Sequence, residues 1–259
     1  RTELTLWDCK SGQEIGSMSI DLHTSIHLLA VSQNANTAIS VSDYSDSDYR
    51  LVIWHLGNPN AGGISALEGH TKTIRALAIT PDGSKALSSS EDGTIKVWDL
   101  EDEALLMTLS GHIYEGSDAL AISDDGKRAV CVESGKKLNV LDLESGTVLH
   151  SDMGGQTHGH TDLITSMDIF RTAEGLRAVS GSKDNTVKVW DLDQGTLIRT
   201  LTGHSQMVNA VAARGSLAAS VSDDGTLKVW NLSANPEGSR TIEFAFERLN
   251  TFAVHKLSE

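Results

Sequence analysis

Short runs of alternating apolar and polar residues, separated by turn-forming residues, fill most of this chain. The stretch from 73 to 109 contains four such runs, at Thr73–Ile79, Lys85–Ser89, Thr94–Asp99 and Ala104–Leu109. A period of two is typical of a β-strand, whose side chains point alternately to its two faces. Pro-Asp-Gly and Glu-Asp-Gly tripeptides separate the first three runs and favour tight turns. The stretch therefore predicts four antiparallel strands.

The same pattern recurs along the chain, and two short sequence markers that repeat in phase show this. A phrase such as IKVWD or VKVWD occurs six times, and its fourth residue is in turn Trp7, Trp54, Trp98, Leu141, Trp190 and Trp230. A Gly-His pair precedes four of these phrases at a nearly constant distance, with its histidine at His70, His112, His160 and His204. Markers that recur in phase every 40 to 49 residues indicate one supersecondary unit used several times.

Four-stranded repeats of this length with Gly-His and Trp-Asp markers resemble the WD-repeat family of β-propellers. The resemblance covers nearly the whole chain and implies an all-β fold, in which four-stranded blades surround a channel. We expect about six blades: a half blade at 1–22, repeats at about 23–68, 69–110, 111–157, 158–202 and 203–247, and a closing strand at 248–259. The alternative is a fragment of a larger or tandem propeller.

In this family, one Asp, one His, one Ser and one Trp of a blade form a hydrogen-bonded relay. Three repeats carry all four residues: His70, Ser88, Asp92 and Trp98; His160, Ser180, Asp184 and Trp190; His204, Ser220, Asp224 and Trp230. A buried indole N–H needs an acceptor, and a serine hydroxyl can accept from it and donate to imidazole. The nearby serines Ser90, Ser182 and Ser222 share the strand face and remain alternatives. Because the set recurs three times, we expect a structural role rather than a hydrolytic triad.

Two repeats depart from the pattern. The repeat that ends near Leu141 has Cys131 at the serine position and Gly135 at the aspartate position, so His112 lacks its partners and this blade should be the least rigid. The repeat of Trp54 lacks the Gly-His pair, although a histidine at position 23 lies close to that place. Its long acidic hairpin, SDYSDSDYR, is either a solvated extension or a tyrosine-bearing lip that contacts a partner.

The family resemblance also implies where a partner would bind. Propellers of this family usually act as rigid platforms that bind peptides or domains on the top face. If the four strands of a blade are lettered a to d in chain order, this face carries the loops between strands d and a and between strands b and c. By this analogy three positions per repeat point there: two residues after the histidine (Lys72, Tyr114, Asp162, Gln206), inside the first strand (His27, Arg75, Asp118, Thr165, Asn209), and before the relay aspartate (Glu91, Lys183, Asp223).

These positions vary in size and charge while the framework repeats, as expected when a function is placed on a repeated scaffold. Ordinary surface variation would give the same picture. We expect Tyr114, Arg75 and His27 to be the anchors, since large or flat side chains dominate interfaces. The acidic members would give the rim a mixed to acidic character and favour a basic peptide.

Charge and cysteine content narrow the partners and the compartment. The chain has 21 Lys+Arg against 35 Asp+Glu, a formal net charge of −14, which argues against nucleic acid and against anionic membranes. Two cysteines favour a reducing, cytoplasmic compartment, although one disulfide stays open. No apolar run reaches the roughly 20 residues that span a bilayer. Because the chain opens on arginine, we expect a processed piece or a fragment.

The sequence favours a non-catalytic protein–protein interaction scaffold or sensor module, without cofactor or metal. Its regular repeats look like the propeller parts of multidomain NACHT/STAND-type signalling NTPases, so other domains of the same polypeptide are candidate partners. The alternative is a propeller-based enzyme with a metal or hydrolytic site in the channel. Only Asp118 and Asp168 supply carboxylates on the first strands, and His158 with His160 is a weak metal motif. A sugar-binding propeller ranks last, because aromatic residues make up only 5% of the chain.

Overall fold

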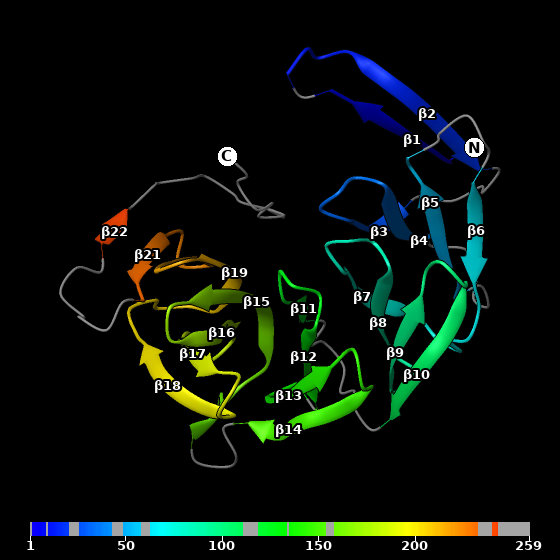
Figure 1. Ribbon diagram of the computed structural model, residues 1–259. Coiled ribbons are helices and arrows are strands. Elements are labelled where there is room, and N and C mark those ends of the chain that lie inside the picture. Colours follow the sequence, from blue (N-terminus) through cyan, green and yellow to red (C-terminus); the bar gives the residue numbers. More distant parts are fainter. Residues whose placement is uncertain are drawn as a thin grey trace. The chain divides into compact units, whose positions relative to one another are not determined.

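The fold is built almost entirely from short antiparallel strands (Figure 1). The computed structural model describes residues 2–8, 10–20, 26–42, 49–57, 63–110, 119–133, 135–153, 158–232 and 240–242. Within them the strands form five four-stranded sheets and one two-stranded sheet, each made from strands that are consecutive in the sequence. The predicted all-β class, with blades of four antiparallel strands, is confirmed. The predicted closing strand at 248–259 lies outside the described residues, as do Tyr114, Asp118 and most of the long acidic hairpin.

The chain divides into two compact units, of which the first is Arg1–Gly111. Its two-stranded sheet contains β1 (Thr2–Trp7) and β2 (Glu14–Ile20). Its four-stranded sheets contain β3 (Ile26–Val31), β4 (Thr37–Ser42), β5 (Leu51–His55) and β6 (Ile64–Leu67), and then β7 (Ile74–Ile79), β8 (Lys85–Ser90), β9 (Thr94–Asp99) and β10 (Ala104–Ser110). The four strands predicted for residues 73–109 therefore match β7 to β10 within one residue at each end.

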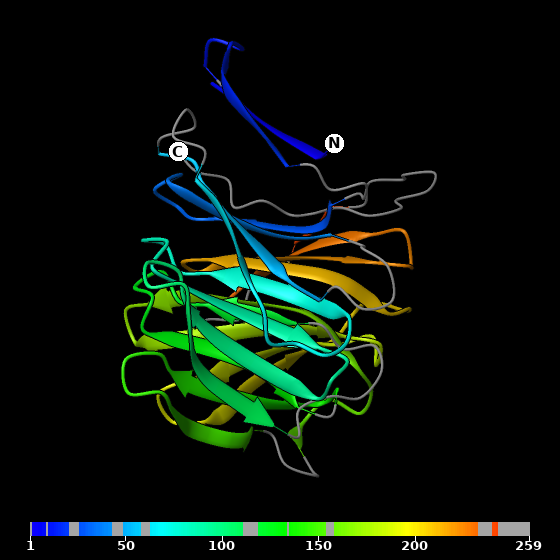
Figure 2. The ribbon, with the colours of Figure 1, turned by 90° about the vertical axis from the view of Figure 1, so that its right-hand side faces the viewer.

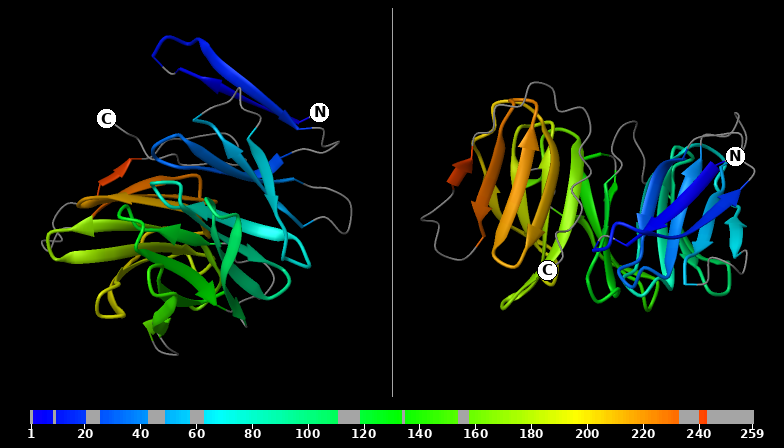
Figure 3. Two further views of the ribbon diagram at one scale, coloured as in Figure 1. Left: turned by 45° about the vertical axis from the view of Figure 1, so that its right-hand side comes forward. Right: turned by 90° about the horizontal axis from the view of Figure 1, so that it is seen from above.

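The second unit is His112–Glu259, and its three sheets follow one another in sequence. They contain β11 (Leu120–Ile122), β12 (Arg128–Glu133), β13 (Lys137–Asp142) and β14 (Thr147–Met153); β15 (Ile164–Thr172), β16 (Gly175–Ser182), β17 (Val187–Asp191) and β18 (Thr196–Leu201); and β19 (Val208–Arg214), β20 (Leu217–Ser222), β21 (Leu227–Asn231) and β22 (Arg240–Ile242). The sheets stack face to face, and the β15–β18 sheet lies between the other two (Figure 3).

Stacking explains why the middle strands are apolar on both faces. In the first unit the β3–β6 sheet lies between the two-stranded sheet and the β7–β10 sheet (Figure 2). Four of the marker tryptophans pack on the sheet that precedes their own: Trp54, for example, joins Met18 of β2, and Trp98 joins Ile39 and Ile53. Each of these indoles is at most 5% exposed. Burial of such large rings between sheets supplies much of the apolar stabilisation.

The glycine of the Gly-His marker has a steric reason. Gly69 has φ +153 and a Cβ there would lie 3.1 Å from Cη2 of Trp98; Gly203 has φ +151 and would meet Trp230 at 3.5 Å. A side chain at either position would strain the backbone, and at Gly69 it would also press on the buried indole. The two sequence markers are therefore in contact with each other.

Among the residues that the structure describes, no helix has the length and apolar character of a membrane span.

Candidate partner-binding site

Three repeats contain the same chain of hydrogen bonds, from a buried indole to a carboxylate. In the first, Nε1 of Trp98 donates to Oγ of Ser88 over 2.8 Å, and Ser88 Oγ lies 2.7 Å from Nε2 of His70. Nδ1 of His70 then lies 2.8 Å from Oδ2 of Asp92. The other two sets repeat these distances within 0.1 Å (His160, Ser180, Asp184, Trp190; His204, Ser220, Asp224, Trp230).

The chemistry of the donors fixes the direction of the relay. The serine hydroxyl accepts from the indole, so its single proton donates to the histidine Nε2, and the histidine Nδ1–H donates to the carboxylate. Burial lowers the pKa of His70 and His204, even though the neighbouring aspartates act in the opposite sense. Burial alone would raise the pKa of Asp92, but hydrogen bonds from Thr94, Thr71 N–H and His70 outweigh it and lower the pKa. The relays of His70 and His204 therefore hold a neutral imidazole against an ionised carboxylate.

Sequence reasoning missed one member of each relay, a threonine two residues after the aspartate. Thr94 donates its hydroxyl to Oδ1 of Asp92 over 2.6 Å, and its backbone N–H donates to the same oxygen over 2.9 Å. Thr186 and Thr226 make the same two bonds to their aspartates. The signal was present, because Asp-Gly-Thr, Asp-Asn-Thr and Asp-Gly-Thr occupy the same place in the three repeats.

The buried hydroxyls of the relays are unsuited to nucleophilic attack. Ser88 and Ser180 are 0% exposed and Ser220 is 1% exposed, and each hydroxyl oxygen already accepts from an indole. A nucleophilic serine must present its oxygen to a substrate while its histidine removes the proton. Despite the Ser, His and Asp composition, we therefore assign these sets a structural role.

The second serine of each repeat holds two loops together. Ser90 donates its hydroxyl to the carbonyl oxygen of Lys72 over 2.8 Å and accepts from the N–H of Asp92. Ser182 and Ser222 donate in the same way to the carbonyls of Asp162 and Gln206. We call the edge that such a loop pair forms on its own sheet the relay edge of that sheet: residues 70–73 with 91–93 in the first unit, and 160–163 with 183–186 and 204–207 with 223–226 in the second. The alternative that these serines occupy the relay itself is wrong, because Ser88, Ser180 and Ser220 take that place.

The predicted partner-binding residues of the first unit meet on the relay edge. Lys72 and Arg75 are exposed, and Nε of Arg75 donates to Oε1 of Glu91 over 2.8 Å. The hydrogen bond from Arg75 lowers the pKa of Glu91, so this pair is ionised and its charges largely cancel. His27 lies on β3 with Nε2 3.4 Å from the carbonyl oxygen of Ile74. Lys72 also helps to lower the pKa of Glu91, so Lys72, Arg75 and Glu91 together carry one net positive charge.

In the second unit the relay edge presents a different set of side chains. Asp162, Lys183, Gln206, Asn209 and Asp223 are all exposed. Asn209 donates its amide to Oδ1 of Asp223 over 2.6 Å, which orients that carboxylate without neutralising it. Lys136 adds a second ammonium, because its Nζ donates to the carbonyl oxygen of Thr161 in the same loop over 2.7 Å.

Thr165 does not face outward as the prediction required. Its hydroxyl donates to the carbonyl oxygens of Val208 and Gly181, so it ties β15 to the neighbouring sheet. The prediction placed this position, just inside the first strand, on the top face by analogy with the family. In this repeat the hydroxyl is short enough to bond back to the backbone.

The two repeats that depart from the relay pattern, those of Trp54 and Leu141, keep only parts of the relay. Trp54 donates to Ser40 over 2.8 Å in the repeat that lacks the Gly-His pair. Cys131 is buried with Sγ 3.9 Å from the carbonyl oxygen of Asn139, and Leu141 replaces the indole. Trp7 is 58% exposed, since among the described residues no earlier sheet covers it as the preceding sheets cover the other four marker tryptophans.

Asp168, one of the two carboxylates considered for a channel enzyme, accepts hydrogen bonds from backbone N–H groups. Oδ2 of Asp168 accepts from the N–H of Ala213 over 3.0 Å, and Oδ1 accepts from the N–H of Ile169. Asp168 thus joins β15 to β19. Among the residues that the structure describes, no group of three His, Cys, Asp or Glu side chains is placed to hold a metal ion.

Comparison with known proteins identifies the repeats. The family described as WD domain, G-beta repeat matches residues 63–99, 153–191 and 195–231, which are the three repeats with complete relays. Nuclear distribution protein PAC1 of Arthroderma otae is 27% identical over 159 residues, 59% of this chain and 34% of that protein.

Two further relatives share shorter segments. Anaphase-promoting complex subunit cdh1 of Dictyostelium discoideum is 30% identical over 97 residues (38% of this chain, 12% of that protein). Methylosome protein WDR77 of Xenopus laevis is 44% identical over 54 residues (21% of this chain, 16% of that protein). The chain therefore spans about a third or less of the length of these relatives.

Proposed function

Since the chain belongs to the WD-repeat family, we propose that it is a non-catalytic interaction module that binds a protein or peptide on its relay edge. The observation that carries the proposal is the contrast at this edge. The same hydrogen bonds from Ser90, Ser182 and Ser222 hold the loops in three repeats, while the side chains displayed there all differ. A rigid, repeated frame with variable exposed side chains suits recognition, because little conformational entropy is lost on binding.

The second unit favours a basic partner. Asp162 and Asp223 are exposed carboxylates on adjacent sheets, and Asn209 fixes the direction of one of them. The chain as a whole carries a net charge of −14, which adds a long-range attraction for positive segments. We propose a peptide segment rich in lysine or arginine, from another protein or from another domain of the same polypeptide.

The proposal includes a compartment. Two cysteines in 259 residues suit a reducing environment, in which hydrogen bonds and apolar packing rather than disulfides maintain the fold. We therefore place the module in the cytoplasm, as a scaffold or as the sensor part of a signalling protein.

A titration with matched peptides tests the partner class. Fluorescent 12-residue peptides with alternating glycine and lysine, glutamate or serine would be added to the chain, and their anisotropy measured. We expect the lysine peptide to bind most tightly. The Asp162→Asn/Asp223→Asn variant should weaken it about tenfold, as loss of two charge-assisted contacts implies.

The matched control removes two charges elsewhere. Glu101 and Asp102 are exposed in the turn between β9 and β10, at the edge opposite the relay edge of their sheet. Glu101→Gln/Asp102→Asn should leave the lysine peptide's affinity within about twofold, the scale of a general charge effect. Equal weakening by both double variants would show that net charge alone attracts the peptide and would overturn the assignment of the relay edge.

A further inference from the structure

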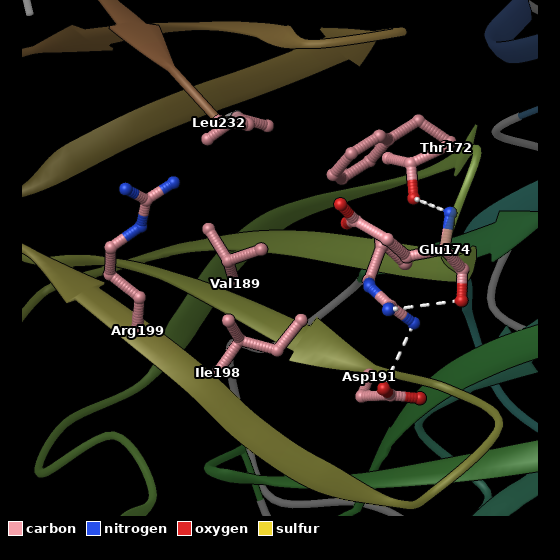
Figure 4. Close-up of a pocket in the computed structure, with 9 residues that line it drawn as sticks. Thr172, Glu174, Val189, Asp191, Ile198, Arg199 and Leu232 are labelled. Atoms are coloured by element: carbon pink, nitrogen blue, oxygen red, sulfur yellow. Dashed lines mark hydrogen bonds and ion pairs between the residues drawn. The ribbon is translucent and has the colours of Figure 1, made fainter. Parts of the chain in front are cut away.

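A cleft lies in the second unit, between the β15–β18 and β19–β22 sheets (Figure 4). It has a volume of ≈ 370 Å³ and is lined from the β15–β16 turn, from β17 and β18, and from Leu232 after β21. Antiparallel strands place the β15–β16 and β17–β18 turns at the end of the sheet opposite the relay edge. The cleft is therefore separate from the proposed partner site.

The floor of the cleft is apolar. Val189 and Ile198 lie between Arg199 and Glu174, and Leu232 closes the space from the neighbouring sheet (Figure 4). Phe170 is 3% exposed and anchors the wall, whereas Ile198 remains 48% exposed. An exposed isoleucine beside a preformed cavity gains stability when an apolar group covers it. The cleft therefore has room and surface for an aliphatic side chain.

The two arginines of the cleft are held differently. Arg177 forms an ion pair with Asp191 at 2.9 Å and donates to the carbonyl oxygens of Leu176 and Glu174. Arg199 donates from Nη2 to the carbonyl oxygen of Asn231 over 3.3 Å, and its Nε is buried without a hydrogen-bond partner among the described residues. No carboxylate of the described residues forms an ion pair with Arg199. Because the buried Nε is out of reach of a ligand, an anionic acceptor in the cleft would bind at the terminal nitrogens of this guanidinium.

The residue equivalent to Arg199 in the preceding repeat is His150, which contacts the next sheet. His150 pairs with Val140 as Arg199 pairs with Val189. Nε2 of His150 lies 3.2 Å from the carbonyl oxygen of Asp193 on the next sheet, and the His150 ring packs against Gly195. Both side chains thus reach the next sheet, but the second is an arginine that carries a positive charge beside a cavity.

We propose that this cleft binds a short peptide segment in which an acidic residue stands beside aliphatic residues. The carboxylate accepts from Arg199, and a neighbouring aliphatic side chain covers Ile198 and Val189. The volume lies at the small end of the roughly 300–1,000 Å³ found for ligand sites, so two or three residues fill it. Glu174 at the far end repels a second acid, and this sets the direction of the segment. The site would act independently of the relay edge.

The test uses defined probes on the full chain. The probe is a fluorescein-labelled peptide amide, Gly-Ile-Asp-Ile-Gly, and its isostere Gly-Ile-Asn-Ile-Gly lacks only the charge. We expect saturable binding of the acidic peptide and at least tenfold weaker binding of the isostere. Methyl NMR should show shifts for Ile198 and none for Ile122, which lies on a different sheet.

Two substitutions separate the site from general charge effects. Arg199→Gln keeps a side-chain donor for Asn231 and should weaken the acidic peptide about tenfold, while Arg171→Gln should not. Arg171 is a matched control because it is an exposed arginine of the same sheet that pairs with Asp125 outside the cleft. Asp162→Asn/Asp223→Asn should leave this binding unchanged, so the failure of one proposal is distinguishable from that of the other.

Three results would overturn the proposal. The isostere could bind as well as the acidic peptide; Arg199→Gln and Arg171→Gln could have the same effect; or the shifts could fall outside the Ile198 region. A titration with octanoate tests whether the carboxylate comes from a peptide or from a free acid. If octanoate shifts Ile198 and neither peptide does, the cleft takes a free apolar acid, and the peptide assignment is wrong.

Discussion

Each relay serine serves two buried rings with one hydroxyl, so its loss should cost more than its size suggests. Ser180→Ala leaves Nε1 of Trp190 and Nε2 of His160 without partners in the sheet interior. An unsatisfied buried group costs about 1–3 kcal/mol, so we expect a loss of about 2–4 kcal/mol in the free energy of unfolding. Urea denaturation measures it. Ser145→Ala, in an exposed turn, should change the same quantity by less than about 0.5 kcal/mol; equal effects would contradict the relay's structural role.

The buried histidines predict how stability depends on pH. Burial lowers the pKa of His70 and His204 below the ordinary 6.5, so the unfolded chain binds protons more readily than the folded chain as the pH falls through that value. Their contribution to stability is present above pH 6.5 and is lost as the pH falls towards the folded-state pKa. We expect the melting temperature to decrease between pH 7.5 and 5.5.

A histidine variant isolates this contribution. His70→Asn/His204→Asn removes the two titrating groups and should flatten the decrease in melting temperature between pH 7.5 and 5.5, while it lowers the melting temperature at pH 7.5. A decrease of unchanged slope in the double variant would assign the pH dependence to other groups and contradict this account.

At the scale of strands, alternation in the sequence predicted β7 to β10 within one residue but could not choose between two serines. Ser88 and Ser90 lie two residues apart and therefore share a face of β8. Their positions along the strand differ. Ser88 pairs with Lys96 in mid-strand beside the indole, whereas Ser90 pairs with Thr94 at the turn. A period of two identifies the face of a residue, not its distance from a partner that is remote in sequence.

The same limit explains what else the sequence analysis missed. The cleft at Arg199 depends on Leu232, on a neighbouring sheet, and on the bonds that satisfy Arg177. Neither can be derived from one repeat taken alone. Similarly, Thr165 matched a surface position by alignment of repeats, but its hydroxyl reaches Val208 on the next sheet. Repeat alignment predicts backbone positions well and contacts between repeats poorly.

In the second unit, the β11–β14 sheet lacks a complete relay and should open more readily than the β15–β18 sheet beside it. In β12 and β13, Cys131 and Leu141 replace the serine and the tryptophan, and Gly135 replaces the aspartate. We expect backbone amides of β12 and β13 to exchange with solvent deuterium at least tenfold faster than those of β16 and β17, because local opening breaks fewer side-chain bonds there. Mass spectrometry of peptides from the two sheets measures the rates. Equal protection would show that strand pairing alone sets local stability.

At the scale of the whole molecule, the net charge of −14 makes the proposed interaction depend on salt. The screening length falls from roughly 30 Å at 0.01 M to about 10 Å at 0.1 M salt. Raising sodium chloride from 0.02 to 0.3 M should therefore weaken the lysine peptide at least tenfold and leave the serine peptide unchanged. Affinity of the lysine peptide that is insensitive to salt would contradict electrostatic recognition.

We propose that each complete relay holds the relay edge of its sheet rigid for a partner. A hydrogen-exchange footprint of the chain saturated with the lysine peptide tests this proposal. We expect added protection in the loops 160–163, 183–186, 204–207 and 223–226 of the second unit, and none in the turns 142–146 and 191–195 at the opposite edge of their sheets. Protection confined to those opposite turns, or spread evenly over both edges, would contradict it.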